Sequence, residues 1–204
     1  MAVELASVYK LLKKKYGPQG WWPIVNVETG KSEYGLGAPR NEADIFEIAI
    51  GAILTQNVAW TNVEKAIVKL KTSGIFTPQS LYKAKESKIA SLITSTGYYN
   101  QKTKKIKNFL EWFKSYNFSF EAVSGLKTPE IRKQLLEIKG TGAETADSIL
   151  LYGLGKKIFV VDAYTKRIFS RIGFFSEKDS YNDIQEFFHK NFKGTVASYN
   201  EFHA

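Results

Sequence analysis

The sequence predicts an all-α protein, and three observations support this prediction. Apolar residues recur at helical spacing in one segment after another along the 204 residues. Residues typical of helix starts and helix ends separate these segments. Only one run, residues 157–161, looks strand-like, and it is too short to form a sheet alone. A chain of this length can bury a sizeable core and form one or two compact domains.

The composition favours a polyanionic partner and excludes some kinds of site. Lys and Arg number 29 against 20 Asp and Glu, which gives a net charge of +9. Such an excess favours binding to phosphates through attraction and counterion release. The sequence has no cysteine, so these residues can hold neither a disulfide nor a thiolate-bound zinc ion or iron–sulfur cluster. No apolar run reaches the ~20 residues that span a bilayer, and the first residues lack the layout of a secretion signal, so we expect a cytoplasmic protein.

The N-terminal part combines a surface helix with an aromatic segment. Residues 3–16 place apolar residues at near-helical spacing between lysines, which predicts a helix. Trp21, Trp22 and Pro23 follow it. Because successive side chains diverge in an extended segment, we expect one tryptophan to face a cavity. The alternative is that both tryptophans pack in the core.

Residues 44–54 are apolar nearly all round and predict a buried helix with Asn41 as its N-cap. The helix ends at the polar residues 55–57, and a second helix is expected at 59–71. Polar side chains at this place are also typical of a simple corner between two helices.

Further helices are expected from Thr77, from Ser87 and over 98–116. The third of these is long, basic and amphipathic. Its lysines are expected to lie mostly outward, either as a solvated face or as phosphate contacts at the helix start. They are Lys102, Lys104, Lys105 and Lys107.

The stretch from Leu135 to Asp162 has the strongest organisation. A helix should begin near Pro129, with Thr128 as its cap, and a second helix should cover 143–150. The turn 140–142 between them reads Gly-Thr-Gly, and glycine adopts positive φ without a Cβ penalty. Free amides at the start of the second helix suit an anion such as a phosphate, although an ordinary packing corner has the same local pattern.

Asp162 stands alone between the strand-like run and a short basic helix expected at 163–172. Aspartate is among the best N-caps, so capping alone explains its place. A helix N-terminus also favours a charged carboxylate, and the two roles are compatible. The last clear helix is expected at 179–192.

These patterns together resemble the helix-hairpin-helix base-excision glycosylases of the endonuclease III superfamily. The resemblance covers the chain from about Ala43 onward. It rests on the following motifs, which occur in the family's order: Ile-Leu-Thr-Gln-Asn at 53–57, Gly-Tyr-Tyr-Asn-Gln-Lys at 97–102, Leu-x-x-Ile-x-Gly-x-Gly-x-x-Thr-Ala-x-x-Ile at 135–149, and Val-Val-Asp at 160–162.

The resemblance implies two helical domains with an active cleft between them. One would be a six-helix barrel formed by residues 44–156, which contains the helix-hairpin-helix motif. The other would be a helical domain formed by residues 1–43 and 157–204, from both chain ends.

The resemblance also implies a catalytic role for Asp162. Breaking an N-glycosidic bond develops positive charge on the sugar, which a nearby carboxylate stabilises while it orients the attacking water. Bifunctional family members carry a lysine nucleophile at the position of Glu144, and a carboxylate cannot form a Schiff base. We therefore expect a monofunctional DNA glycosylase that uses water, with Asp162 and Glu144 as its catalytic residues.

Trp21, Trp22, Pro23 and Phe46 resemble the aromatic base pocket of the 3-methyladenine DNA glycosylase branch. Aromatic faces attract cations, so the expected substrate is an alkylated purine such as 3-methyladenine, turned out of double-stranded DNA. The alternatives are an endonuclease III-like glycosylase for damaged or mismatched pyrimidines, and a non-catalytic DNA-binding protein.

The remaining expectations also come from the resemblance. Gln56 or Asn57 would fill the space left by the displaced base. Carbonyls of Leu136, Ile138 and Thr141 would hold a monovalent cation, Na⁺ or K⁺, and no other cofactor would be required. We expect a monomer that contacts the DNA backbone through Lys102, Lys139, Gly140, Thr141, Gly142, Ala143 and Thr145.

Overall fold

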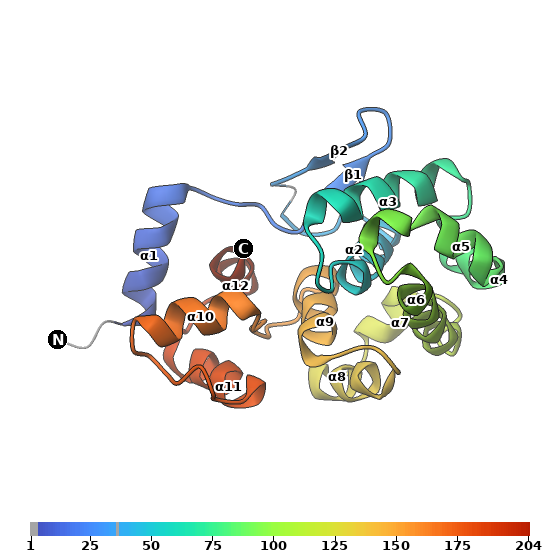
Figure 1. Cartoon of the computed structure of the whole chain (residues 1–204). Coiled ribbons are helices and arrows are strands. Elements are labelled where there is room, and N and C mark those ends of the chain that lie inside the picture. Colours follow the sequence, from blue (N-terminus) through green and yellow to red (C-terminus); the bar gives the residue numbers. More distant parts are fainter. Residues whose placement is uncertain (1–3, 36) are drawn as a thin grey trace.

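The computed structural model describes residues 4–35 and 37–204 and confirms the all-α class (Figure 1). Val3, where the first predicted helix starts, lies outside the described residues. Two groups of helices face each other. The smaller group contains α1 (Leu5–Tyr16), α10 (Ala163–Arg171), α11 (Tyr181–Asn191) and α12 (Val196–His203). The larger group contains α2 (Glu42–Leu54), α3 (Trp60–Thr72), α4 (Pro78–Lys83), α5 (Glu86–Leu92), α6 (Tyr99–Lys114), α7 (Phe120–Ser124), α8 (Thr128–Glu137) and α9 (Ala143–Ser148).

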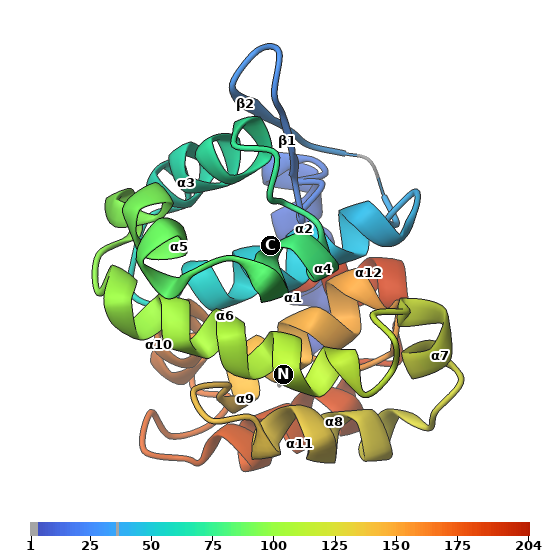
Figure 2. The same ribbon diagram turned by 90° about the vertical axis from the view of Figure 1, so that its right-hand side faces the viewer.

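Helix α2 lies at the centre of the larger group (Figure 2) and packs against α3, α6 and α9. Asn41 caps it as predicted, because its Oδ1 accepts the amide of Asp44 at 3.0 Å. The Thr77 side chain caps α4 in the same way. These local caps fix where the helices begin.

Several helix ends differ from the prediction. Helix α8 begins at Thr128 with Lys127 as its cap, and no side chain makes the capping hydrogen bond. Helix α9 passes into a buried π-helical turn, η2 (Ile149–Gly153), instead of continuing as an α-helix. The chain also forms α7 and α12, which the sequence analysis does not identify; both are short. A short 3₁₀ turn, η1 (Thr94–Thr96), precedes α6.

The prediction of a strand at 157–161 is wrong. No strand forms there, because side chains of α11 bind the backbone of this connecting segment. Instead, β1 (Ile24–Asn26) and β2 (Lys31–Glu33) form a small antiparallel hairpin between the tryptophan segment and α2. The Asn26 side chain accepts two amides of the connecting turn, which explains why the chain reverses there.

Helix α6 buries one of the lysines that were expected to face outward. Lys102 is only 2% exposed, and its Nζ donates to the carbonyl oxygens of Leu54 at 2.8 Å and Thr96 at 2.7 Å. Burial and the nearby charge of Lys105 lower the pKa of Lys102 to about 8. The predicted phosphate contact of Lys102 therefore needs correction, since its ammonium group is used inside the protein.

Replacing Lys102 by Met should lower the free energy of unfolding by about 1–3 kcal/mol, because two buried carbonyls lose their donor. Denaturant unfolding at pH 7 measures this loss. Lys104→Met is the matched control, since Lys104 lies two residues away on the same helix and is exposed. Equal losses in the two variants would contradict the structural role of Lys102.

Candidate active site

A cleft of about 1610 Å³ lies between the two groups of helices. Its walls come from α1, from the turn between α2 and α3, from the hairpin between α8 and α9, from the start of α10 and from the end of α12. Asp162, Glu144, Trp21 and Trp22 all line it. Residues from near both chain ends, Tyr9 to Ala204, thus line one space.

Asp162 is the N-cap of α10. Its Oδ1 accepts the amide of Thr165 at 2.6 Å, and the side chain is half-buried. No other hydrogen bond to this carboxylate comes from the described residues. The helix dipole stabilises its negative charge, and Oδ2 is left for an interaction in the cleft.

Glu144 lies in the first turn of α9, on the same cleft as Asp162. Solvent reaches its side chain, but partial burial by the cleft walls raises the pKa of Glu144, and the negative charge of Asp162 raises it further. The two carboxylates therefore interact. Glu144 keeps its proton to a higher pH than an isolated glutamate does.

An aromatic cluster forms one wall of the cleft. The ring centroids of Trp21 and Trp22 lie 5.2 Å apart, and Trp60 lies 5.1 Å from Trp21 and 5.6 Å from Trp22. Both tryptophans line the cleft. Trp21 is half-buried, whereas Trp22 is only 8% exposed and also belongs to the hydrophobic core. Trp60 was not among the predicted pocket residues. Its place at the start of a helix, directly after a polar turn, could have indicated that it faces the cleft.

Two predicted pocket residues do not line the cleft. Phe46 is 1% exposed and packs against Phe76, with ring centroids 5.3 Å apart. Pro23 is buried and is absent from the cleft wall. Because α2 is apolar on nearly every face, its sequence does not show which face meets the cleft, and the assignment of Phe46 to the pocket needs correction.

The tryptophan segment is held at both ends by carboxylates. Glu201 of α12 accepts the amides of residues 19 and 20 at 2.8 and 3.0 Å. The buried Glu47 of α2 accepts the Val25 amide at 2.6 Å, and its ion-pair partner Lys71 donates to the Val25 carbonyl at 2.6 Å. Burial raises the pKa of Glu47, and Lys71 opposes that rise. The position of the aromatic wall thus depends on both groups of helices.

The two predicted wedge residues, Gln56 and Asn57, both lie in the turn after α2, but they make different contacts. The Gln56 amide donates to the Gly140 carbonyl at 3.3 Å and to Thr145 Oγ1 at 3.0 Å, and its Oε1 accepts from Lys105. Gln56 is therefore tied to the hairpin. Asn57 is exposed, lines the cleft and has a positive φ of 56°.

The hairpin turn needs glycine at its first position. Gly140 has φ +99°, and a Cβ there would lie 2.5 Å from Cγ of Lys105. Lys139, Gly140 and Gly142 are exposed, whereas Thr141 and Thr145 are buried. Lys139 does not line the cleft. An anion could therefore approach the turn from its exposed side.

A tyrosine and a histidine form a pair at the edge of the cleft: Tyr152 is buried, and His203 is half-buried and lines the cleft wall. Tyr152 Oη is 2.7 Å from Nδ1 of His203. Burial raises the pKa of Tyr152 well above its ordinary value and lowers that of His203, and the charge of Asp162 raises both. The sequence offers no signal for this pair, because its members come from η2 and α12, far apart in the chain.

His189 should make the protein less stable in acid. Its Nε2 accepts the Phe159 amide at 2.9 Å, and burial lowers its pKa. The unfolded chain therefore takes up the proton first, so this stabilisation is complete above pH ~6.5 and is lost as the pH falls below it. Between pH 7 and pH 5, His189→Gln should lose less unfolding free energy than the wild type. Parallel pH profiles for the two proteins would contradict this assignment.

Comparison with known proteins identifies the family. Residues 50–193 match the family described as "HhH-GPD superfamily base excision DNA repair protein". The chain belongs to the HhH-GPD superfamily. The match includes the hairpin, Glu144 and Asp162, whereas the paired tryptophans lie before it.

Three relatives place the chain within this superfamily. It is 42% identical over 200 residues to the "Putative DNA repair glycosylase MJ1434" of Methanocaldococcus jannaschii, covering 97% of this chain and 83% of that one. It is 32% identical to Endonuclease III of Sulfolobus acidocaldarius over 79% of this chain and 70% of the relative. The crystal structure of H. pylori 3-methyladenine DNA glycosylase (MagIII), bound to 1,N6-ethenoadenine, superposes with a TM-score of 0.78 at 28% identity and covers 98% of this chain and 94% of that one.

Two further observations concern the residues that the structure describes, 4–35 and 37–204. None of their helices is long and apolar enough to cross a membrane. They contain no group of three or more His, Cys, Asp or Glu side chains arranged to hold a metal ion.

Proposed function

We propose that this HhH-GPD protein is a monofunctional DNA glycosylase that hydrolyses the N-glycosidic bond of a damaged base turned out of double-stranded DNA. One observation carries the proposal: Asp162 and the paired tryptophans line the same cleft, beside the hairpin. A base seated against Trp21 and Trp22 would bring its sugar towards the carboxylate.

Asp162 would act on the sugar. As the bond to the base lengthens, positive charge develops on C1′, and a carboxylate held at a helix N-terminus stabilises it. The hydrogen bond from Thr165 fixes one oxygen of Asp162 and leaves the other to orient or deprotonate water. Glu144 and Glu201 also carry carboxyl groups on this cleft. Glu201 is bound to the amides of residues 19 and 20, so Glu144 would help to order the water.

The absence of an amine from position 144 supports hydrolysis without strand cleavage. Lys13 and Lys105 also line the cleft. Lys105 donates to Gln56, however, and Nζ of Lys13 lies 5.8 Å from the Tyr9 ring centroid. Neither lysine is held beside Asp162, so we propose that water is the nucleophile.

An alkylated purine such as 3-methyladenine is the substrate we favour. Such bases carry positive charge, which the faces of Trp21, Trp22 and Trp60 attract. The structural similarity to the 3-methyladenine DNA glycosylase of H. pylori also supports this substrate. The 32% identity to Endonuclease III supports a second candidate, the removal of damaged or mismatched pyrimidines.

The DNA contacts follow from the exposed residues around the cleft. We propose Asn57 as the wedge, because Gln56 is tied to the hairpin. The Thr141 amide already donates to the Ile138 carbonyl at 2.9 Å. The amides of Gly140, Gly142 and Ala143 and the side chain of Lys139 would bind the backbone next to the lesion. In this proposal the protein acts as a monomer, with residues 44–156 as one domain and both chain ends as the other.

A monovalent cation at the hairpin fits the residues present there. The buried Oγ1 of Thr141 has no hydrogen-bond partner among the described residues. The carbonyls of Leu136, Ile138 and Thr141 would complete a set of oxygen ligands suited to Na⁺ or K⁺. When bound, the cation would add positive charge near the DNA phosphate.

The direct test is to incubate the protein with methylated DNA and with duplexes that carry defined pyrimidine lesions. The freed bases are then identified by chromatography, and strand breaks are scored without alkali. We expect release of 3-methyladenine and an intact strand. Binding to all duplexes with no base released would contradict an enzymatic role, and strand cleavage without alkali would contradict the water mechanism.

A further inference from the structure

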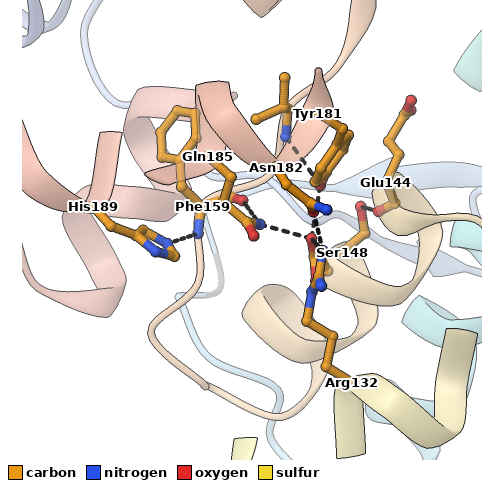
Figure 3. Close-up of polar contacts among 10 residues, drawn as sticks. Arg132, Glu144, Ser148, Phe159, Tyr181, Asn182, Gln185 and His189 are labelled. Atoms are coloured by element: carbon orange, nitrogen blue, oxygen red, sulfur yellow. Dashed lines mark hydrogen bonds and ion pairs between the residues drawn. The ribbon is translucent and has the colours of Figure 1, made fainter. Parts of the chain in front are cut away.

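A buried polar network behind the active site connects α9 to the segment that ends at Asp162 (Figure 3). We infer that this network sets the position of Asp162, and that Tyr181 and Gln185 are positioning residues for base release. This inference rests on the proposed function. Tyr181 also lines the cleft wall, whereas Gln185 and Asp147 do not.

The centre of the network is Asp147 of α9, which is completely buried. Its carboxylate accepts from Arg132 Nε at 2.7 Å and Nη2 at 3.1 Å. It also accepts from Tyr181 Oη at 2.8 Å and from Gln185 Nε2 at 2.7 Å. Side chains of α8 and α11 therefore satisfy this buried charge, which would be costly without partners.

The same side chains hold the backbone just before Asp162. Tyr181 Oη accepts the Val161 amide at 3.2 Å, and Gln185 Nε2 donates to the Phe159 carbonyl at 2.6 Å. His189 Nε2 accepts the Phe159 amide. Figure 3 shows Tyr181, Gln185 and His189 reaching this segment from one side. No neighbouring strand binds 159–161, so these contacts replace a sheet ladder.

The network also fixes Glu144 and Asp162 relative to each other. Glu144 is three residues before Asp147 on α9, and Ser148 Oγ donates to the Glu144 carbonyl at 2.7 Å. Asp162 directly follows Val161. Tyr181 thus joins the helix that carries Glu144 to the segment that carries Asp162, through a single hydroxyl group.

Apolar packing alone would specify this geometry less closely. Side chains around Phe159 and Val161 are buried, but packing is not directional, whereas the hydrogen bonds define where each amide and carbonyl lies. A displacement of about 1 Å at a reacting group can lower a rate by about 100-fold. A loss of one network bond should therefore reduce catalysis more than it reduces DNA binding.

Tyr181→Phe tests the inference, because it removes only the oxygen that joins Val161 to Asp147. We expect the single-turnover rate of base release to fall about 10-fold or more, while affinity for a duplex with a neutral tetrahydrofuran abasic site changes less than about two-fold. The preference for a duplex with a cationic pyrrolidine at the sugar position should fall as well. Gln185→Met removes the donor to Phe159 and Asp147. It should likewise slow base release and leave affinity for the tetrahydrofuran duplex nearly unchanged.

Tyr199→Phe is the matched control. Tyr199 is buried in the same helical group, and its hydroxyl donates to the Phe192 carbonyl at 3.1 Å. Its ring packs against Phe159 with ring centroids 5.7 Å apart, and phenylalanine keeps this ring while it removes a hydroxyl that makes no hydrogen bond to the segment 159–161. Thermal unfolding should show that Tyr199→Phe loses about as much stability as Tyr181→Phe. Tyr199→Phe should nevertheless keep the wild-type rate of base release and the wild-type preference for the pyrrolidine duplex.

The outcomes separate this inference from the proposed function. If Tyr181→Phe and Gln185→Met behave like Tyr199→Phe, the network is only structural and the inference is overturned. If Tyr181→Phe and Gln185→Met both release the base more slowly and both bind the pyrrolidine duplex with less preference, the inference is supported. If Asp162→Asn itself keeps the wild-type rate, the proposed function fails, whatever the network variants do.

Discussion

Asp162→Asn is expected to slow base release by about 100- to 1000-fold, the range typical for the loss of one electrostatic contact to a transition state. The substitution removes the negative charge that faces the developing positive charge on the sugar. It should leave the fold intact, since asparagine is as good an N-cap as aspartate and can still accept the Thr165 amide. Single-turnover kinetics on a lesion duplex measure the effect, and DNA affinity should change less than about two-fold.

Asp183→Asn is the matched control for Asp162→Asn. Asp183 belongs to the capping box of α11 with Ser180, and it is absent from the cleft wall. The control removes the same charge from another helix N-terminus, so it should retain the wild-type rate. Equal slowing in both variants would show that net charge matters and the position of Asp162 does not.

Glu144→Lys is expected to give the protein a covalent reaction that the wild type lacks. The introduced amine would stand on the cleft beside Asp162, where it can attack C1′ as the base leaves and form an imine with the opened sugar. Borohydride reduction during the reaction should then trap a protein–DNA complex. We expect trapping to rise from none to a readily detected fraction of the enzyme.

Glu144→Arg controls for the reversal of charge, because a guanidinium group carries the same charge but forms no such imine under these conditions. It should give no trapped complex. Trapping by the wild-type protein would contradict hydrolysis by water, and absence of trapping with Glu144→Lys would show that position 144 does not reach the sugar.

Local features of the fold could be predicted from the sequence, and features that depend on distant contacts could not. Asn41 and Asp162 cap helices as expected, because a cap involves residues only three positions apart. Thr128 does not make the capping bond predicted for it, because α8 begins at Thr128 itself. The burial of Lys102 was missed, since its carbonyl partner Leu54 lies 48 residues away. The run 157–161 has strand-like residues but finds side-chain partners instead of a neighbouring strand.

The same distinction holds for the candidate site. Asp162, Glu144 and the hairpin belong to one continuous motif, so their meeting on one cleft could be predicted. Phe46 could not be placed, because a helix that is apolar all round does not show which face meets the cleft. The network around Asp147 joins three helices through side chains that no local pattern relates.

The most direct measurement of the central claim compares two abasic duplexes. One carries a pyrrolidine, whose cation stands at the sugar position, and the other carries a neutral tetrahydrofuran. If Asp162 faces the sugar of an everted nucleotide, the wild-type protein binds the pyrrolidine duplex more tightly and Asp162→Asn removes that preference. Equal affinity of the wild type for both duplexes, or a preference that survives Asp162→Asn, would contradict the claim.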